Sequence, residues 1–92
     1  IWSLFFMNFL KIRSELDSKF EKLAKKNKKQ LEIILDKANE ILEYPHRYKN
    51  LKAPMNHLKR VHIDKHFVLV FSIDEESKTI TLEDYDHHDK IF

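Results

Sequence analysis

Two residue types are missing from this sequence, cysteine and glycine, and only two prolines occur among its 92 residues. Without cysteine, the chain can form neither a disulfide framework nor a thiolate metal site, and this composition fits a reducing compartment. Without glycine, it lacks the loops that cradle phosphates in P-loop and dinucleotide-binding proteins, so we exclude both classes. For the same reason we expect no tight turn with a positive φ angle.

Long hydrophobic runs are also missing. The apolar stretch Ile1–Met7 is far too short to cross a bilayer, and it lacks the basic region that begins a signal peptide. We expect residues 1–6 to be an upstream extension, with Met7 as the natural start. We therefore expect a cytoplasmic protein that does not associate with a membrane.

The length of the chain predicts a single domain over residues 1–92, with a core so small that a bound partner could add stability. Its charge is unevenly distributed: 15 Lys and Arg oppose 8 Asp and Glu through Val70, whereas 2 oppose 7 from Phe71 onward. A basic body attracts a polyanion such as RNA. For the helical lysines, an ordinary solvated helix surface is the simpler interpretation.

The N-terminal half predicts one strand and two helices. Aromatic and β-branched residues mark a strand within Phe5–Ile12, and Ser14 or Asp17 can cap the helix that follows. The lysines around Asn27 indicate the break between the helices. The second helix has the clearer pattern and ends at Pro45, because the residue before a proline avoids helical geometry. Its apolar stripe consists of Leu31, Ile34, Leu35, Ala38, Ile41 and Leu42.

The C-terminal half predicts three strands after a basic loop over residues 44–56. The strands cover Leu58–Ile63, Phe67–Ile73 and Thr79–Tyr85, and a longer turn at Glu75–Lys78 joins the last two. The middle strand is apolar on both sides, so we expect it to be central in the sheet and covered on both faces. The predicted class is α+β: an N-terminal strand, a two-helix hairpin and a three-stranded antiparallel C-terminal sheet.

Four stretches stand out within this order of elements. They are Tyr48-Lys49-Asn50-Leu51, Arg60-Val61-His62-Ile63, Phe67-Val68-Leu69-Val70-Phe71 and Asp86-His87-His88-Asp89-Lys90-Ile91-Phe92. Together they resemble the RelE/ParE superfamily of toxins from type II toxin–antitoxin pairs. Within it the chain is most similar to the YafQ-type branch of RelE, which relies on histidines and a terminal aromatic residue. The resemblance covers nearly the whole chain after Met7.

This resemblance implies a RelE-like fold of the microbial RNase type and an mRNA interferase that cuts messages in the ribosomal A site. It implies no metal and no cofactor, because the message's own 2′-OH attacks the neighbouring phosphate. It also implies a RelB-like antitoxin that binds and silences the toxin, in a complex that we expect to be heterotetrameric. The mRNA and the ribosome are the other partners that it implies.

The resemblance also assigns roles to single residues. His62 falls at the catalytic strand histidine of the branch, and His88 falls at its C-terminal histidine. His66 and Phe67 occupy the place of an acid–aromatic pair, so that a histidine replaces the acid. Phe92 matches the terminal aromatic residue. The predicted catalytic residues are therefore His88, His62 and His66.

Cleavage by an internal 2′-OH needs a proton acceptor, a proton donor and groups that stabilise the charge on the phosphorane. Histidine suits the first two roles because imidazole titrates near neutral pH, and lysine or arginine suits the third. Phe67 and Phe92 can stack on a splayed base. Lys49 stands at a further functional histidine of the YafQ-type branch, and Val68 replaces a strand arginine of RelE itself. The predicted phosphate-binding cations are Lys49, Lys52, Arg60 and Lys65.

Simpler interpretations apply to several of these residues. Phe67 and Phe92 fit a hydrophobic core as well as a stacking role. Arg60 fits an ion pair with an acid such as Asp64. His87 is expected on the other side of its strand, in a structural role.

A metal site is a further alternative, since His62 and His66 have the spacing of paired ligands on a helix. This stretch predicts a strand and a turn instead, in which the two rings diverge. We therefore predict no metal site.

Two other functions stay open from the sequence. One is a ParE-like inhibitor that binds a topoisomerase and cleaves nothing, and the other is a binding module that kept the fold without the activity. The histidine cluster favours the nuclease, because a topoisomerase inhibitor has no use for it.

Overall fold

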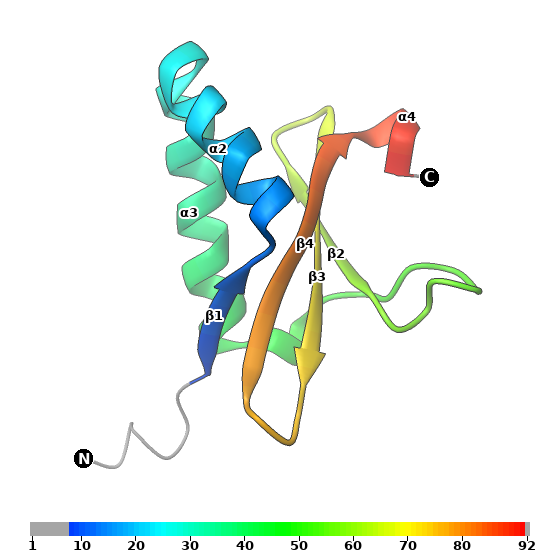
Figure 1. Cartoon of the computed structure of the whole chain (residues 1–92). Helices are drawn as coiled ribbons and strands as arrows, with labels where there is room; N and C mark the ends of the chain where they lie inside the picture. The colour runs from blue at the N-terminus through cyan, green and yellow to red at the C-terminus, as the bar shows by residue number, and fades with distance from the viewer. Residues whose placement is uncertain (1–7, 92) are drawn as a thin grey trace.

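The structure, a computed structural model, describes residues 8–91 and has two layers, a four-stranded sheet and a helical hairpin (Figure 1). Three strands follow the hairpin, and the helices cover one face of the sheet. This confirms the predicted α+β class. The elements are β1 (Phe9–Ile12), α2 (Ser14–Lys26), α3 (Lys28–Glu43), the 3₁₀ turn η1 (Pro45–Arg47), β2 (Lys59–Ile63), β3 (Phe67–Asp74), β4 (Thr79–His87) and α4 (His88–Ile91).

The break between α2 and α3 lies at Asn27, as predicted. The Asn27 backbone N–H donates to the Leu23 carbonyl and ends α2, while its side chain accepts a hydrogen bond from the Gln30 backbone N–H and caps α3. The predicted cap of α2 was wrong. Arg13 occupies the N-cap position without a side-chain hydrogen bond, and Ser14 and Asp17 already lie inside the helix.

The sheet has the strand order β1-β4-β3-β2. β2, β3 and β4 pair antiparallel, as predicted for the C-terminal half. β1 pairs parallel with β4, from Phe9 opposite Thr79 to Ile12 opposite Leu82. The predicted first strand began at Phe5, and its part before Asn8 lies outside the described residues.

β3 is buried on both faces, which confirms the prediction for the middle strand. Leu69 and Phe71 face the helices, within a core that also contains Leu16 and Ile34. Val68 and Val70 face the other way and pack with Leu51, and the half-buried Leu58 and Ile91 complete this second cluster. The loop before β2 and the short helix α4 therefore cover the face that the helical hairpin leaves open.

Two turns contradict the expectation that a chain without glycine avoids positive φ angles. Asp64 has a φ angle of 58° and Lys78 one of 56°. Asp tolerates this conformation, whereas for Lys it costs about 1 kcal/mol. The predicted longer turn before β4 is confirmed, and the Asp74 carboxylate supports it by accepting hydrogen bonds from the Glu76 and Ser77 backbone N–H groups. Within residues 8–91, no helix is long and apolar enough to cross a membrane.

Candidate functional site

Two of the predicted histidines meet three of the predicted cations around one hollow of about 380 Å³. The hollow lies where β2, the loop before it and the start of α4 come together. Its lining consists of Lys49, Asn50, Lys52, Arg60, His62 and His88. We call it the histidine hollow.

β2 places His62 and Arg60 on the same face of the sheet. His62 lies opposite Val68 and Arg60 lies opposite Val70, and both valines face away from the helical hairpin. Because side chains alternate along a strand, the next residues, Val61 and Ile63, point into the main core, where both are buried.

His88 lines the same hollow from the C-terminal end of the chain. It is the first residue of α4, and its backbone N–H donates a 2.7 Å hydrogen bond to the His66 carbonyl in the β2–β3 turn. The rings of His62 and His88 lie 5.8 Å apart between centroids, in an edge-to-face arrangement. Both side chains are exposed, so a substrate can reach them.

The loop before β2 places Lys49 and Lys52. The Arg60 backbone N–H donates to the Lys49 carbonyl at 3.0 Å, and the Leu51 backbone N–H donates to the Leu58 carbonyl at 2.8 Å. Leu51 is only 5% exposed and packs on the sheet between the two lysines. These contacts therefore hold the loop, and with it the two lysines, in place.

Asn50 also lines the hollow and was not among the predicted site residues. Its side chain donates to the Asn56 carbonyl at 2.7 Å and accepts from Lys59 Nζ at 3.0 Å. These bonds close the loop against β2. In the sequence, Asn50 was marked only by its place next to Lys49 in one of the four stretches that carry the family resemblance.

The charges in the hollow suit a phosphate. Three cations surround the two imidazoles, and among residues 8–91 no carboxylate lines the hollow. Beside the hollow, the Asp89 carboxylate lies 3.7 Å from His88 Nδ1. Imidazoles beside fixed cations can move protons while a neighbouring anion is stabilised.

The structure places three other predicted residues outside this hollow. The ring of His66 stacks on that of His87, with centroids 6.0 Å apart, instead of facing His62. Lys65 is exposed in the β2–β3 turn, and Phe67 lies on the helix-covered face, stacked on Tyr85. Phe92 lies outside the described residues.

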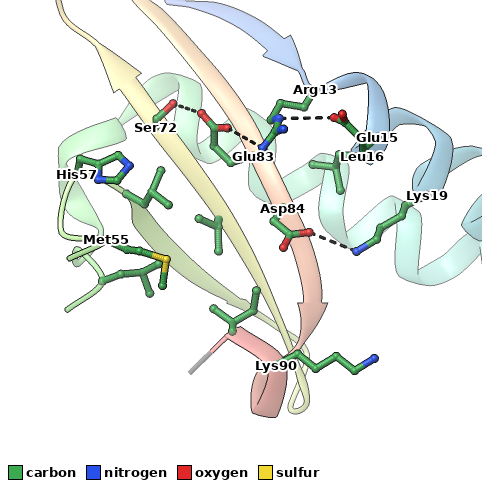
Figure 2. A pocket seen from close by; sticks show the side chains of 14 residues that line it. Arg13, Glu15, Leu16, Lys19, Met55, His57, Ser72, Glu83, Asp84 and Lys90 are labelled. Carbon is green, nitrogen blue, oxygen red and sulfur yellow. Dashed lines mark hydrogen bonds and ion pairs between the residues drawn. The ribbon is translucent and has the colours of Figure 1, made fainter. Parts of the chain in front are cut away.

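A second and larger hollow, of about 620 Å³, lies on the same side of the sheet as the second cluster (Figure 2). Its floor is apolar, and includes Val70 and Ile91. At its rim the Ser72 hydroxyl donates to Glu83 at 2.6 Å, and Arg13 lies 3.7 Å from the same carboxylate. None of the predicted site residues within 8–91 lines it, and its rim charges largely neutralise one another, so it offers less to a phosphate.

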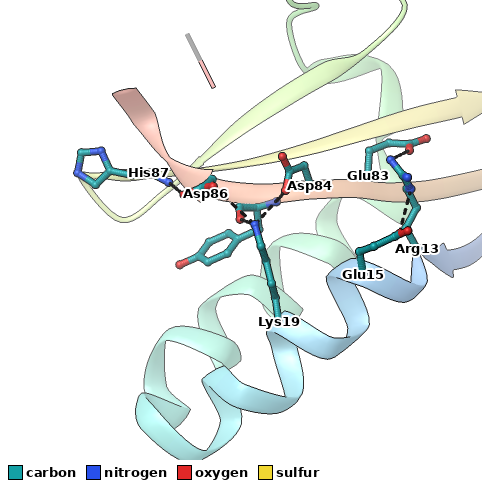
Figure 3. A network of polar contacts seen from close by, with 8 residues as sticks. Arg13, Glu15, Lys19, Glu83, Asp84, Asp86 and His87 are labelled. Atoms are coloured by element: carbon teal, nitrogen blue, oxygen red, sulfur yellow. Dashed lines mark hydrogen bonds and ion pairs between the residues drawn. The ribbon is translucent and has the colours of Figure 1, made fainter. Parts of the chain in front are cut away.

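A polar network ties α2 to the end of β4 (Figure 3). Lys19 Nζ lies 3.3 Å from the Asp84 carboxylate and 3.6 Å from that of Asp86. Burial alone would raise the pKa of Asp86, but the His87 backbone N–H and the charges of Lys19 and Lys90 hold that pKa below its ordinary value.

Tyr85, between these acids, faces the core. Burial raises the pKa of its hydroxyl, although a 2.9 Å hydrogen bond from the Gln30 amide opposes the shift. The network and this bond fix the end of β4, which is followed directly by His88 at the start of α4.

No group of three or more His, Asp or Glu side chains in residues 8–91 could hold a metal ion. His62 and His66 diverge, as expected of a strand followed by a turn.

No family model matches the sequence. Two curated relatives do. An uncharacterized protein of Methanosarcina mazei is 91% identical over 86 residues, which cover 94% of this chain and all of that protein. A Methanocaldococcus jannaschii protein named "Putative toxin RelE4" is 53% identical over 83 residues, which cover 90% of this chain and 88% of that protein.

Solved structures share the fold at low sequence identity. The toxin–antitoxin complex RelBE2 of Mycobacterium tuberculosis contains a chain that matches with a TM-score of 0.75 and 18% identity, over 89% of this chain and 99% of that one. A mutant of the Escherichia coli toxin RelE in the free state matches with a TM-score of 0.70 and 19% identity, over 86% and 81%. Escherichia coli YafQ matches with a TM-score of 0.63 and 19% identity, over 92% and 98%.

Proposed function

This chain belongs to the RelE family of toxins from toxin–antitoxin systems, and from that premise we propose that it is a ribosome-dependent endoribonuclease that cleaves mRNA. The observation that carries the proposal is the histidine hollow. It combines two imidazoles 5.8 Å apart with three cations. These are the groups that cleavage by an internal 2′-OH requires.

In the proposed reaction, one of the two imidazoles accepts the proton of the 2′-OH. The freed oxygen attacks the adjacent phosphorus, and the bond from phosphorus to the 5′ oxygen breaks. The other imidazole, protonated, donates its proton to that leaving oxygen. The products are a 2′,3′-cyclic phosphate and a free 5′-OH, so the reaction needs neither water nor a metal.

Lys49, Lys52 and Arg60 serve the phosphate in this proposal. Negative charge accumulates on the non-bridging oxygens in the transition state, and cations already held in place stabilise it without reorganisation. The hydrogen bonds that fix the loop to β2 hold the lysines in place. His66 contributes its backbone carbonyl, which holds His88 at the start of α4.

We also propose a RelB-like antitoxin as the protein partner, in a heterotetrameric complex. A toxin–antitoxin complex is among the solved structures that share this fold. The basic hollow would attract an acidic segment of such a partner.

The test is mRNA cleavage on translating ribosomes. The purified chain is added to programmed ribosomes, and new message ends are mapped. We expect cuts within A-site codons, and a loss of about 10²- to 10⁴-fold in cleavage rate for His88→Ala and for His62→Ala, as is typical for removal of an acid–base group. His66→Ala should lose less, because the backbone carbonyl that holds His88 is kept.

The matched control is His46→Ala. His46 is exposed and pairs with Glu75 in the turn after β3, at the opposite end of that strand from the hollow. This variant should cut at the wild-type rate. Cuts that persist in His88→Ala would remove that residue from the chemistry. Toxicity without any cuts would contradict the nuclease and favour a topoisomerase inhibitor.

A further inference from the structure

A third hollow, of about 360 Å³, opens on the helix-covered face, between α2 and the end of β4. It is separate from the histidine hollow, with which it shares no lining residue. Its floor is apolar and aromatic, and four lysines and Asp86 form its rim. The residues that matter here are Lys22, Leu23, Lys26, Phe67, Tyr85 and Lys90, and we call this site the aromatic–lysine groove.

The floor of the groove contains two flat, stacked rings. Phe67 and Tyr85 lie 5.2 Å apart between centroids, with an angle of 13° between their planes. Tyr85 is only 7% exposed and accepts a hydrogen bond from the Gln30 amide, so Phe67 stacks on a ring that is held in place. Phe67 itself is only partly buried. A rigid, accessible aromatic ring is the kind of surface on which a nucleobase stacks.

The charge of the rim is positive. Lys19 and Lys90 also line the groove, and their two positive charges offset those of the Asp84 and Asp86 carboxylates, with which Lys19 forms ion pairs (Figure 3). Within residues 8–91, no carboxylate lies in ion-pair distance of Lys22 or Lys26. These two lysines stand one turn apart on α2, and both are exposed. Successive cations along an aromatic floor fit the backbone of a single strand.

The groove and the histidine hollow meet at the same end of the sheet. The ring of His87 lies edge-on to Phe67 at 5.6 Å and stacks on His66 at 6.0 Å. The next residue in the chain, His88, lines the histidine hollow on the other face. The rings of Phe67, His87 and His66 therefore run from the groove to the β2–β3 turn, where the His66 carbonyl accepts the hydrogen bond from the His88 backbone N–H.

We propose that the aromatic–lysine groove binds a single-stranded segment of RNA, with a base stacked on Phe67 and phosphates at Lys22 and Lys26. This inference rests on the proposed nuclease function and extends it. A strand that passes through the histidine hollow continues around His66 and His87 and is held on the opposite face. The groove then contributes binding and register, and the hollow contributes the chemistry.

RNA suits the groove better than an acidic peptide does. A flat ring with lysines beside it matches a ligand in which bases and anionic groups alternate regularly. A peptide would need backbone hydrogen-bond partners, and the edge of β4 at this end already engages Lys19 through the Tyr85 carbonyl.

The test measures binding of a fluorescein-labelled single-stranded oligoribonucleotide by anisotropy. His88→Ala is the background in every sample, so that the RNA stays intact. We expect Lys22→Gln with Lys26→Gln to weaken binding about tenfold at low salt, and to reduce the slope of log K against log salt by about 1.4, since each phosphate contact on a single strand contributes about 0.7.

The matched control is Lys25→Gln with Lys29→Gln. It removes the same charge from the same helical hairpin, at exposed positions that do not line the groove. We expect less than a twofold change. Equal weakening by both pairs would mean a general charge effect and would overturn the proposal.

Phe67→Leu tests the aromatic floor, because it keeps an apolar side chain and removes the stacking surface. We expect binding to weaken about fivefold or more, with circular dichroism showing a folded chain. Wild-type affinity in a folded Phe67→Leu would overturn base stacking. As a separate readout, photo-crosslinks from a 4-thiouridine probe should fall on Phe67 or Tyr85. If the lysine pair weakens an acidic peptide and leaves RNA binding intact, the ligand is a protein and the proposal is wrong.

This experiment separates the groove from the nuclease. If ribosomes show no cleavage while the groove variants lose RNA, the nuclease fails and the groove stands. If cleavage occurs and the lysine pair binds RNA like its control, the nuclease stands and the groove fails.

Discussion

His62 and His88 owe their positions to different parts of the fold. The alternation of β2 turns His62 to the face opposite the helices, and a hydrogen bond to the His66 carbonyl fixes the start of α4 beside it. Neighbouring histidines in the sequence take other directions, since the rings of His66 and His87 stack on one another. His87, the last residue of β4, and His88, the first of α4, are adjacent in the sequence, but only His88 lines the hollow.

Asp86 makes the stability of the chain sensitive to acid. Its pKa in the folded state is lowered, so the ionised form stabilises the fold. This contribution is complete well above the ordinary value of 3.8 and is lost as the pH falls through the folded pKa. We expect Asp86→Asn to flatten the fall in unfolding free energy below pH 5, as measured by urea denaturation.

Lys19→Met provides the second arm of that experiment. Removal of the lysine charge should raise the pKa of Asp86 toward its ordinary value, which carboxyl NMR signals report directly. A pKa of Asp86 that does not move would show that the His87 backbone hydrogen bond and the charge of Lys90 lower it without Lys19.

Leu51 couples the loop before β2 to the second cluster. It is buried against Val68 and Val70 and lies between Lys49 and Lys52. We expect Leu51→Ala to cost about 2–3 kcal/mol in unfolding free energy. We also expect it to reduce RNA cleavage under conditions where the chain stays folded, because the loop that carries the two lysines is held less firmly. Leu35→Ala, at a position 45% exposed on α3, should change both by little. Full activity in a destabilised Leu51→Ala would show that cleavage does not depend on how firmly this loop is held.

The turn before β4 stores backbone strain at Lys78, whose φ angle is 56°. Asn accepts this conformation more readily than Lys does. We expect Lys78→Asn to raise the unfolding free energy by about 0.5–1 kcal/mol in chemical denaturation. Lys65→Asn, in the β2–β3 turn and without a positive φ angle, is the control and should have almost no effect. A loss of stability in Lys78→Asn would show that the lysine has a stabilising contact that outweighs the strain.

Sequence patterns predicted those elements whose own residues determine them. The stripe of α3 and the apolar run of β3 each indicate one structure only, and Asn27 marks the break between the helices. The parallel pairing of β1 with β4 and the four-residue helix α4 depend on contacts with distant parts of the chain. So does the position of the loop that carries Lys49 and Lys52, which hydrogen bonds to β2 fix.

The candidate site could be predicted only in part for the same reason. The family resemblance pointed to the histidines, but not to the faces on which their rings lie. The fold brings His62 and His88 together and turns Phe67 toward Tyr85. Residue types give the available chemistry, and register decides which groups can act on one substrate.

At the scale of the whole molecule, the histidine hollow and the aromatic–lysine groove lie where positive charge gathers. The loop before β2 and the exposed face of α2 carry positive charge at opposite faces of the same end of the sheet. The acidic residues of β4 are largely tied to Lys19 and Arg13. A nucleic acid strand that approaches this end meets cations on both sides.

The most direct test of the account replaces one 2′-OH of the message. Programmed ribosomes receive a message with a single 2′-deoxy nucleotide at the mapped cleavage position, beside the all-ribose message. We predict that the ribose message is cut and ends in a 2′,3′-cyclic phosphate, whereas the deoxy message stays intact at that position. Cleavage of the deoxy message at the same bond would contradict attack by the 2′-OH, and with it the roles assigned to His62 and His88.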